Sequence, residues 1–183
     1  MPTHAALLRG INLGGRNKVA MADLREIVSS LGHTDVATYI QSGNVVFTAA
    51  DSPSLAADLE RAIRDSLGLS PSVVVLTRDE LAQVVRDNPY PDEPNPRALH
   101  AVFLTEPQTP ATADALANAQ KRVGDAGSGD TAQLIGRTIY LHTPDGFGRS
   151  KLAGLIVQSG KPEMTGTARN WATVTKLLMM LDG

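Results

Sequence analysis

The order in which the hydrophobic pattern changes its period constrains the fold of this chain more than any other feature. A short apolar run that ends at Gly10 is followed by apolar residues at helical spacing, which stop at Gly32. Two runs rich in β-branched residues come next, then a second amphipathic stretch and a further β-branched run. These elements are strands at 4–9, 36–40, 45–47 and 73–76 and helices at 24–31 and 53–67. The order β-α-β-β-α-β predicts a ferredoxin-like fold with an antiparallel sheet.

Local signals support the boundaries of these elements. The sequence Gln41-Ser42-Gly43-Asn44 separates the second and third strands, and its Gly-Asn pair permits the positive φ of a hairpin turn. Asp51 or Ser52 is expected to cap the second helix, with Pro53 in its first turn. Gly68 is expected to end that helix.

The second half repeats the order less regularly. A helix is predicted from near Asp79, and the proline-rich stretch 88–96 cannot continue it. The elements expected after it are a strand at 99–104, a helix at 111–123, hairpin strands at 133–135 and 138–142, and helices at 151–159 and 174–181. A clear fourth strand is missing, unless 161–165 forms it.

The sequence therefore predicts an α+β protein of two tandem ferredoxin-like halves with antiparallel sheets, the second irregular and carrying an extra C-terminal helix. We expect a first domain at 1–78, a helix and Pro-rich connector at 79–97, and a second domain at 98–183.

Composition narrows the class of protein. The chain has 183 residues, of which 42% are hydrophobic and 20% charged, and this suits one or two compact domains. It contains no cysteine, which excludes disulfides and thiolate chemistry. The apolar run before Arg9 is too short for a signal peptide, and no run approaches the ~20 residues of a membrane span. We therefore expect a cytoplasmic protein with no membrane partner.

Charge is distributed unevenly along the chain. Residues 1–18 hold three basic and no acidic side chains, and residues 149–183 hold five basic and two acidic ones. The segment between them carries 17 of the 19 acidic side chains. This distribution argues against nucleic-acid binding through a broad basic surface, but it is compatible with a local anion site.

Topology brings two polar loops together. In the β-α-β-β-α-β order, the loop Gly10–Lys18 and the hairpin Gln41–Asn44 lie at the same end of the sheet, because each intervening element reverses direction. Arg9, Arg16 and Lys18 bring positive charge to this end. Exposed N–H groups, a helix N-terminus and fixed cations favour an anion. The alternative, in which the glycines only permit a tight turn, stays open.

The loop does not match established phosphate-binding motifs. Gly10 and Gly15 have the spacing of a P-loop, but Arg16-Asn17 replaces its Lys-Ser/Thr pair. Gly10, Gly14 and Gly15 also miss the dinucleotide pattern G-x-G-x-x-G. We therefore assign no cofactor.

Other chemistries find no support in the sequence. The four histidines are far apart and none has the spacing of a metal-ligand pair, so no metal site is predicted and each is expected to be an ordinary surface or strand residue. No G-x-S-x-G sequence indicates a hydrolase. The third strand lacks the basic and aromatic signature of RNA-recognition domains, so stacking on bases is not expected.

Four separated motifs resemble one family. They are Arg9 to Gly15 with Asn17-Lys18, Tyr39 to Phe47, Ser150-Lys151-Leu152, and Thr167 to Trp171 with Thr173 to Leu177. In this order they closely resemble the bacterial family called domain of unknown function 1697, over nearly the whole chain, although residues 89–129 contribute little. The resemblance implies a two-part ferredoxin-like architecture. It implies no activity and carries over no catalytic residue.

The shared motifs fall on polar or cationic residues as well as on core positions, which is the composition of a binding site. The candidate ligand-binding residues are Arg9, Asn12, Gly14, Gly15, Lys18, Gln41, Ser42, Asn44, Lys151, Arg169, Asn170 and Lys176. Thr167 or Asn170 is expected to cap the last helix, with Arg169 placed to reach an anion. The alternative is that Arg169 pairs with an acidic residue and Trp171 packs in the interdomain core.

Three classes of function remain open. The first is binding of an anionic or phosphorylated small molecule, such as a nucleotide, between the two loops and the basic C-terminal segment. The second is an enzyme acting on that ligand, although no candidate residue is an acid or a histidine that would serve in acid–base catalysis. The third is a nucleic-acid or protein interaction module. The sequence leaves the oligomeric state undetermined.

Overall fold

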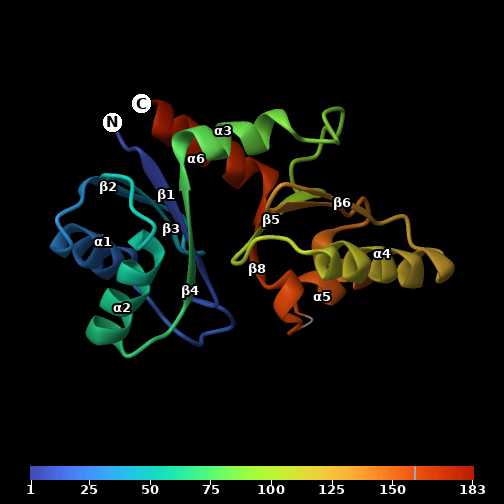
Figure 1. Cartoon of the computed structure of the whole chain (residues 1–183), viewed down its shortest axis with the longest axis horizontal. Helices are drawn as coiled ribbons and strands as arrows, with labels where there is room; N and C mark the ends of the chain where they lie inside the picture. The colour runs from blue at the N-terminus through green and yellow to red at the C-terminus, as the bar shows by residue number, and fades with distance from the viewer. Residues whose placement is uncertain (159) are drawn as a thin grey trace. The chain divides into compact units, whose positions relative to one another are not determined.

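The computed structural model describes residues 1–158 and 160–183 (Figure 1). The chain divides into two compact units, one of residues 1–83 with 176–183 and the other of residues 84–175. Its elements, in order, are β1 (His4–Arg9), α1 (Met21–Ser30), β2 (Thr34–Tyr39), β3 (Asn44–Thr48), α2 (Leu55–Leu67), β4 (Ser72–Thr77), α3 (Arg78–Arg86), β5 (Leu99–Leu104), α4 (Pro110–Asp125), β6 (Thr131–Ile135), β7 (Thr138–His142), η1 (Phe147–Arg149), α5 (Lys151–Val157), η2 (Pro162–Met164), β8 (Gly166–Asn170) and α6 (Trp171–Asp182).

The first unit has the predicted ferredoxin-like sheet. Its strand order is β2-β3-β1-β4, and every neighbouring pair is antiparallel. Side chains alternate along each strand, so Ala6 and Leu8 of β1 share one face with Phe47 of β3. These residues form a core with buried apolar residues of α1 and α2, among them Leu24 and Leu59. The two amphipathic helices thus cover one face of the sheet, as the sequence pattern predicted.

The start of α2 differs from the prediction. We expected Asp51 or Ser52 at the cap, but Pro53 and Ser54 form a turn and the helix begins at Leu55. The Asp51 carboxylate lies 2.9 Å from His4 Nε2, so it is held by the sheet and not by the helix. The predicted end is confirmed, because Gly68 adopts the left-handed conformation with φ of 67°.

The β2–β3 hairpin also differs in detail. Positive φ occurs at Ile40 and Gly43, with values of 51° and 85°, and not at Asn44. Asn44 is instead the first residue of β3, and its side-chain amide donates to the carbonyl of Tyr39 at 2.9 Å. Residues 40–43 therefore make a four-residue turn, which Asn44 closes from the strand.

The second unit has the same strand order, β6-β7-β5-β8, again antiparallel throughout. The fourth strand that the sequence left in doubt is β8, at Gly166–Asn170, whereas the 161–165 segment contains the short helix η2. Sequence patterning missed β8 because it reads Gly-Thr-Ala-Arg-Asn and has no run of apolar β-branched residues. With β8 in place, both halves are ferredoxin-like, and α6 is the additional C-terminal helix.

The core of the second unit lies between its sheet and the helices α4 and α5. Val102, Leu104 and Leu141 from the strands pack with Leu116 of α4 and Leu152 of α5. The sequence predicted α5 over 151–159, and the structure gives Lys151–Val157; Ser159 lies outside the described residues. None of the described helices has the length and hydropathy that a membrane span needs.

Candidate functional site

The two polar loops predicted to be neighbours do meet at one end of the first sheet. The Asn12 side-chain amide donates to the Gln41 carbonyl at 2.7 Å, and the Leu8 N–H donates to the Gly43 carbonyl at 2.8 Å. The connection from α2 to β4, residues 69–71, reaches the same end, because β4 is antiparallel to β1 and begins at Ser72, opposite Arg9. This end of the sheet is therefore built from three loops.

Asn12 fixes the path of the long loop. Its Nδ2 group donates to the carbonyls of Val19 and Gln41, while its Oδ1 accepts from the Val19 N–H at 2.9 Å. Both donor hydrogens and the acceptor are thus engaged with backbone groups. Asn12 was predicted to bind ligand, and these contacts give it a second role, in which it shapes the loop.

The loop folds back on itself as a small hairpin. Leu13 and Arg16 form an isolated bridge, and the intervening Gly14 and Gly15 have φ of 55° and 80°. These values favour glycine, which carries no Cβ to oppose the left-handed backbone. Asn17, with φ of 49°, donates from its side chain to the Gly10 carbonyl at 2.9 Å and closes the base of the hairpin.

The second loop is shaped in the same way. The Asn44 amide donates to the Ser42 hydroxyl at 2.9 Å as well as to the Tyr39 carbonyl. Asn44 is completely buried, so an unpaired amide there would cost free energy. Asn44, like Asn12, was marked by the sequence as a ligand-binding candidate, and its amide also donates to groups of these loops.

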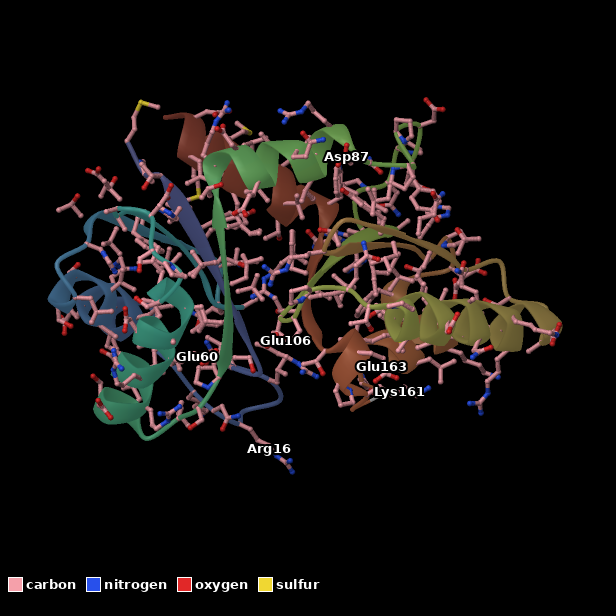
Figure 2. The ribbon with its side chains drawn as sticks, in the orientation of Figure 1. Arg16, Glu60, Asp87, Glu106, Lys161 and Glu163 are labelled. Carbon is pink, nitrogen blue, oxygen red and sulfur yellow. The ribbon has the colours of Figure 1, made fainter. Side chains whose placement is uncertain are left out.

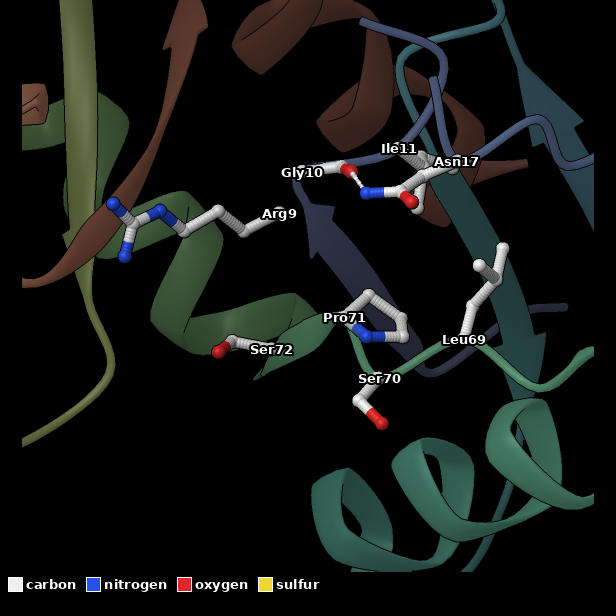
Figure 3. A pocket seen from close by; sticks show the side chains of 8 residues that line it. All are labelled: Arg9, Gly10, Ile11, Asn17, Leu69, Ser70, Pro71 and Ser72. Carbon is white, nitrogen blue, oxygen red and sulfur yellow. Dashed lines mark hydrogen bonds between the residues drawn. The ribbon is translucent and has the colours of Figure 1, made fainter.

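A cavity of about 220 Å³ opens beside the long loop (Figure 3). We call it the Arg9 cavity; it is lined by Arg9, Gly10, Ile11, Asn17, Leu69, Ser70, Pro71 and Ser72. Arg9 and Ser72 are directly opposite each other on β1 and β4, so their side chains lie on the same face of the sheet. Ser70 comes from the α2–β4 connection and accepts from Arg64 Nε at 3.3 Å.

The charges at this end of the sheet are mainly positive. Among the described residues no carboxylate lines the Arg9 cavity, and the Arg64 guanidinium reaches its edge through Ser70. Arg16 and Lys18 are exposed, and Arg16 extends outward from the loop (Figure 2). Neither of these two cations lies within 4 Å of a carboxylate in the described part of the chain.

Glu60 is the acidic residue that contacts the start of β4. Its Oε1 accepts from the Val73 N–H at 2.8 Å, so the carboxylate holds the first residues of this strand in place.

The sequence did not single out the segment Leu69–Ser72. Its two serines have no motif around them, and only the position of the α2–β4 connection brings them beside Arg9. The available signal was topological, since this connection must return to the same end of the sheet as the first loop.

The remaining candidate residues belong to other parts of the fold. Lys151 begins α5 and lines a separate cavity of about 200 Å³ in the second unit, together with Asp130 and Arg149. Lys176 lies on α6, in the segment that groups with the first unit.

Arg169 and Asn170 are part of β8. The Arg169 guanidinium donates to the Thr167 hydroxyl at 2.6 Å and to the Ala168 carbonyl at 2.9 Å. Burial lowers the pKa of Arg169 to about 10. Asn170 Oδ1 accepts from the Thr173 N–H at 2.9 Å, which confirms the predicted cap on the last helix.

The described residues include no group of three or more His, Asp or Glu side chains able to hold a metal ion. All four histidines pack against aromatic rings: His4 and His33 against Phe47, His100 against Phe147, and His142 against Tyr90. His142 also pairs with Glu93 at 2.5 Å.

Comparison with known proteins places the chain among proteins of similar sequence and fold. A family model described as Protein of unknown function (DUF1697) matches residues 1–140. The matched range contains the first two of the four motifs above. A solved structure of a conserved bacterial protein from Streptococcus pneumoniae is similar, with a TM-score of 0.72 and 24% identity, over 98% of each chain. This likeness extends the shared fold to both halves. No curated protein sequence matches the chain.

Proposed function

This chain belongs to the DUF1697 family of proteins of unknown function, and we propose that it binds a small anionic or phosphorylated molecule in the Arg9 cavity. The observation that carries the proposal is the lining of this cavity, whose described residues include an arginine, two serine hydroxyls and an asparagine but no carboxylate. A guanidinium offers paired N–H donors to phosphate oxygens, and hydroxyls donate to the remaining ones.

The size of the cavity limits the part of the ligand that enters it. At about 220 Å³ it is smaller than the ~300–1,000 Å³ that encloses a drug-sized molecule. A phosphate with a small attached group fits such a volume, whereas a whole nucleotide would extend out of it. The anionic end of the ligand is therefore the part that Arg9, Ser70 and Ser72 bind.

The exposed cations act at longer range. Arg16 and Lys18 lie on the loop that forms one wall of the cavity, and both are exposed. Charges of one sign around a cavity raise the local concentration of an oppositely charged ligand. These interactions pass through solvent, so dissolved salt screens them. At physiological ionic strength the screening length is about 8–10 Å.

The lining favours binding over acid–base catalysis. Arg9 is the only ionisable side chain among the residues that line this cavity, and an arginine stays protonated throughout the physiological range. A general acid or base would need a carboxyl or imidazole group within hydrogen-bond reach of the ligand. We therefore assign the cavity to ligand binding.

A thermal-shift screen tests the proposal. The full chain would be heated with phosphate, pyrophosphate, sugar phosphates and mononucleotides, and a bound ligand at about 100 times its Kd stabilises the folded state by about 2.7 kcal/mol. We expect the shift to fall, with affinity reduced at least tenfold, in Arg9→Ala and in Ser72→Ala. Arg25→Ala is the matched control, because Arg25 is an exposed arginine of the same unit that bonds Thr38 on β2.

The proposal fails if no anion in the panel raises the melting temperature, or if Arg25→Ala reduces the shift as much as Arg9→Ala does. Ser72→Ala separates a binding defect from a folding defect, since it removes one hydroxyl and keeps the arginine. Native mass spectrometry of protein purified without denaturation then identifies any ligand that it carries.

A further inference from the structure

A second and larger cavity lies at the other end of the first sheet, where β1 begins. Its volume is about 550 Å³, and its lining includes Thr3, Ala49, Asp51 and Arg78. These residues come from the start of β1, the β3–α2 connection and the β4–α3 junction. The strand β1 separates this cavity from the Arg9 cavity, because His4 and Arg9 are at its opposite ends.

A chain of hydrogen bonds joins three side chains beside this cavity. The Thr3 Oγ1 atom lies 2.8 Å from His4 Nδ1, and His4 Nε2 lies 2.9 Å from Asp51 Oδ1. Thr3 and Asp51 line the cavity and are exposed, whereas His4 is only 3% exposed and lies between them. A hydroxyl, an imidazole and a carboxylate are thus connected in sequence.

When Asp51 is ionised and His4 is neutral, the hydrogen-bonding capacities of the three groups place the protons. An ionised carboxylate only accepts hydrogen bonds, so the Asp51 contact requires a hydrogen on His4 Nε2. In the neutral imidazole, Nδ1 is then the acceptor, and it receives the Thr3 hydroxyl hydrogen. Asp51 therefore selects the tautomer in which His4 can take a proton from Thr3.

The backbone holds Thr3 firmly in this position. Its N–H donates to the Phe47 carbonyl at 3.0 Å, and its carbonyl accepts from the Arg78 N–H at 2.9 Å. The Ala49 N–H donates to Thr3 Oγ1 at 3.2 Å, and the Ala49 carbonyl also lies 3.2 Å from this oxygen. His4 Nδ1, at 2.8 Å, is therefore the nearer acceptor for the hydroxyl hydrogen. The His4 ring is stacked on Phe47, with centroids 5.7 Å apart and an interplanar angle of 20°.

We infer that Thr3 is a nucleophile, activated by His4 as general base with Asp51 as the positioning residue, at a site for acyl transfer. The arrangement meets two geometric criteria for an activated hydroxyl: nucleophile and base lie within hydrogen-bond reach, and the base is oriented by a third group. Here the imidazole uses Nδ1 toward the hydroxyl and Nε2 toward the carboxylate, the reverse of the Ser-His-Asp arrangement of serine proteases.

The reaction at this site is hydrolysis of an ester. Thr3 Oγ1 forms a bond to the acyl carbon as its proton passes to His4 Nδ1. The bond from the acyl carbon to the leaving alcohol oxygen then breaks, and that oxygen takes the proton from His4. Water, deprotonated by His4, cleaves the threonine ester in the same way, so the acid is released and Thr3 is restored.

The charges around the cavity limit the substrate class. Asp51 and Asp79 contribute two exposed carboxylates, while the Arg78 guanidinium is engaged with Asp79 and Asp182 at 3.2 and 2.7 Å. Asp51 in turn contacts His4, so both carboxylates lie in short pairs and the cavity offers little net attraction to a charged substrate. The site therefore takes an uncharged ester, and it differs in this respect from the Arg9 cavity.

A fluorophosphonate probe tests this inference directly. The probe bonds to an activated hydroxyl through phosphorus and releases fluoride, and peptide mapping locates the adduct. We expect a single adduct on Thr3, absent in Thr3→Val and retained in Thr3→Ser. Asp51→Asn should slow labelling at least tenfold with an unchanged melting temperature, and Asp51→Glu should restore part of the rate. Asp65→Asn is the matched control, because it removes an exposed carboxylate of the same unit that does not line the cavity.

Hydrolysis of 4-nitrophenyl acetate by the same variants gives a second readout. Its rate should follow the labelling rate, with kcat lowered in Asp51→Asn and kept in Asp65→Asn. The inference is overturned if Thr3 acquires no adduct, if the adduct forms on another residue, or if Asp51→Asn and the unmodified chain react at the same rate. Any of these results would mean that the three side chains form a hydrogen-bond network that only stabilises the start of β1.

Discussion

Gly43 passes so close to Ile11 that a Cβ atom at position 43 would lie 2.7 Å from Ile11 Cδ1. The same Cβ would lie 2.9 Å from Leu8 Cβ, and Gly43 has a φ of 85°. The hairpin backbone therefore rests directly on the buried side chains that anchor the long loop. This contact sets the spacing between the two loops at the end of the sheet.

Gly43→Ala should destabilise the first unit by about 2–4 kcal/mol, since it combines a steric clash with a left-handed backbone. Urea unfolding measures this change. Gly68→Ala is the control, because Gly68 has a φ of 67° but no neighbouring atom within 4 Å of the place that a Cβ would take. Its cost should be about 1 kcal/mol. Equal losses for the two variants would contradict the close contact with Ile11.

Asn12→Asp tests the role of Asn12 in shaping the loop. The substitution keeps the size of the side chain but replaces an amide that donates to the Val19 and Gln41 carbonyls by a carboxylate that cannot donate. Two lost hydrogen bonds, with an oxygen facing carbonyl oxygens, should cost about 2–3 kcal/mol at neutral pH. Gln41→Glu is the control, since only the backbone carbonyl of Gln41 takes part in this contact. A neutral Asn12→Asp variant would show that the loop holds its shape without the amide.

Ile40→Asn should stabilise the protein. Ile40 is 50% exposed and has a φ of 51°, a conformation that β-branched residues disfavour and asparagine tolerates. Relief of this strain should add about 1 kcal/mol to the free energy of unfolding. Leu31→Asn is the control, because Leu31 is 38% exposed with an ordinary φ of −80°. A lower melting temperature for Ile40→Asn would mean that its side chain makes a stabilising contact.

His100 makes stability depend on pH. Its ring is stacked on Phe147 at 4.0 Å, and burial lowers the pKa of His100 to about 4, against about 6.5 in an unfolded chain. Between these values the unfolded chain binds the extra proton. The free energy of unfolding should therefore fall by about 3 kcal/mol as pH decreases from about 6.5 to about 4, with no further contribution from His100 below that.

His100→Phe checks this dependence. The substitution keeps an aromatic ring against Phe147 and removes the titrating group, and among the described residues His100 Nδ1 is a buried atom that has no hydrogen-bond partner. Urea unfolding at pH 7 and pH 4.5 should show a smaller loss of stability for the variant than for the unmodified chain. Other carboxyl and imidazole groups titrate in both proteins, so the difference between them isolates His100. Parallel losses would contradict a depressed pKa.

Much of the fold was predictable from local pattern. The spacing of apolar residues changes from that of a strand to that of a helix and back, and this can be recognised within short segments. It correctly predicted the ferredoxin-like order of strands and helices in the first half. Glycine at position 68 indicated the end of α2, because the left-handed cap favours that residue. The strand β8 was missed because it is buried by pairing with β5, where for example Arg169 is opposite Ala101, and not by an apolar sequence.

The candidate site was predicted only in part. Topology correctly brought the loop of Asn12 beside the turn of Gln41, since chain direction alone determines which loops share an end of the sheet. It could not predict that the amides of Asn12 and Asn44 would donate to groups of the two loops themselves, because hydrogen-bond partners depend on distances of a few ångströms. Ser70 and Ser72 lie beside Arg9 because the α2–β4 connection returns to this end of the sheet, a topological signal that the prediction of the site did not include.

By itself, the sequence determined the order of strands and helices, the end of the sheet at which cationic loops gather, and the absence of cysteine chemistry. These follow from residue type and from the direction of the chain. Only the tertiary structure placed Asp51 against His4, although 46 residues separate them and no motif links them. Side chains far apart in the sequence become partners only when packing brings their atoms within hydrogen-bond distance. The local pattern of residue types does not predict that distance.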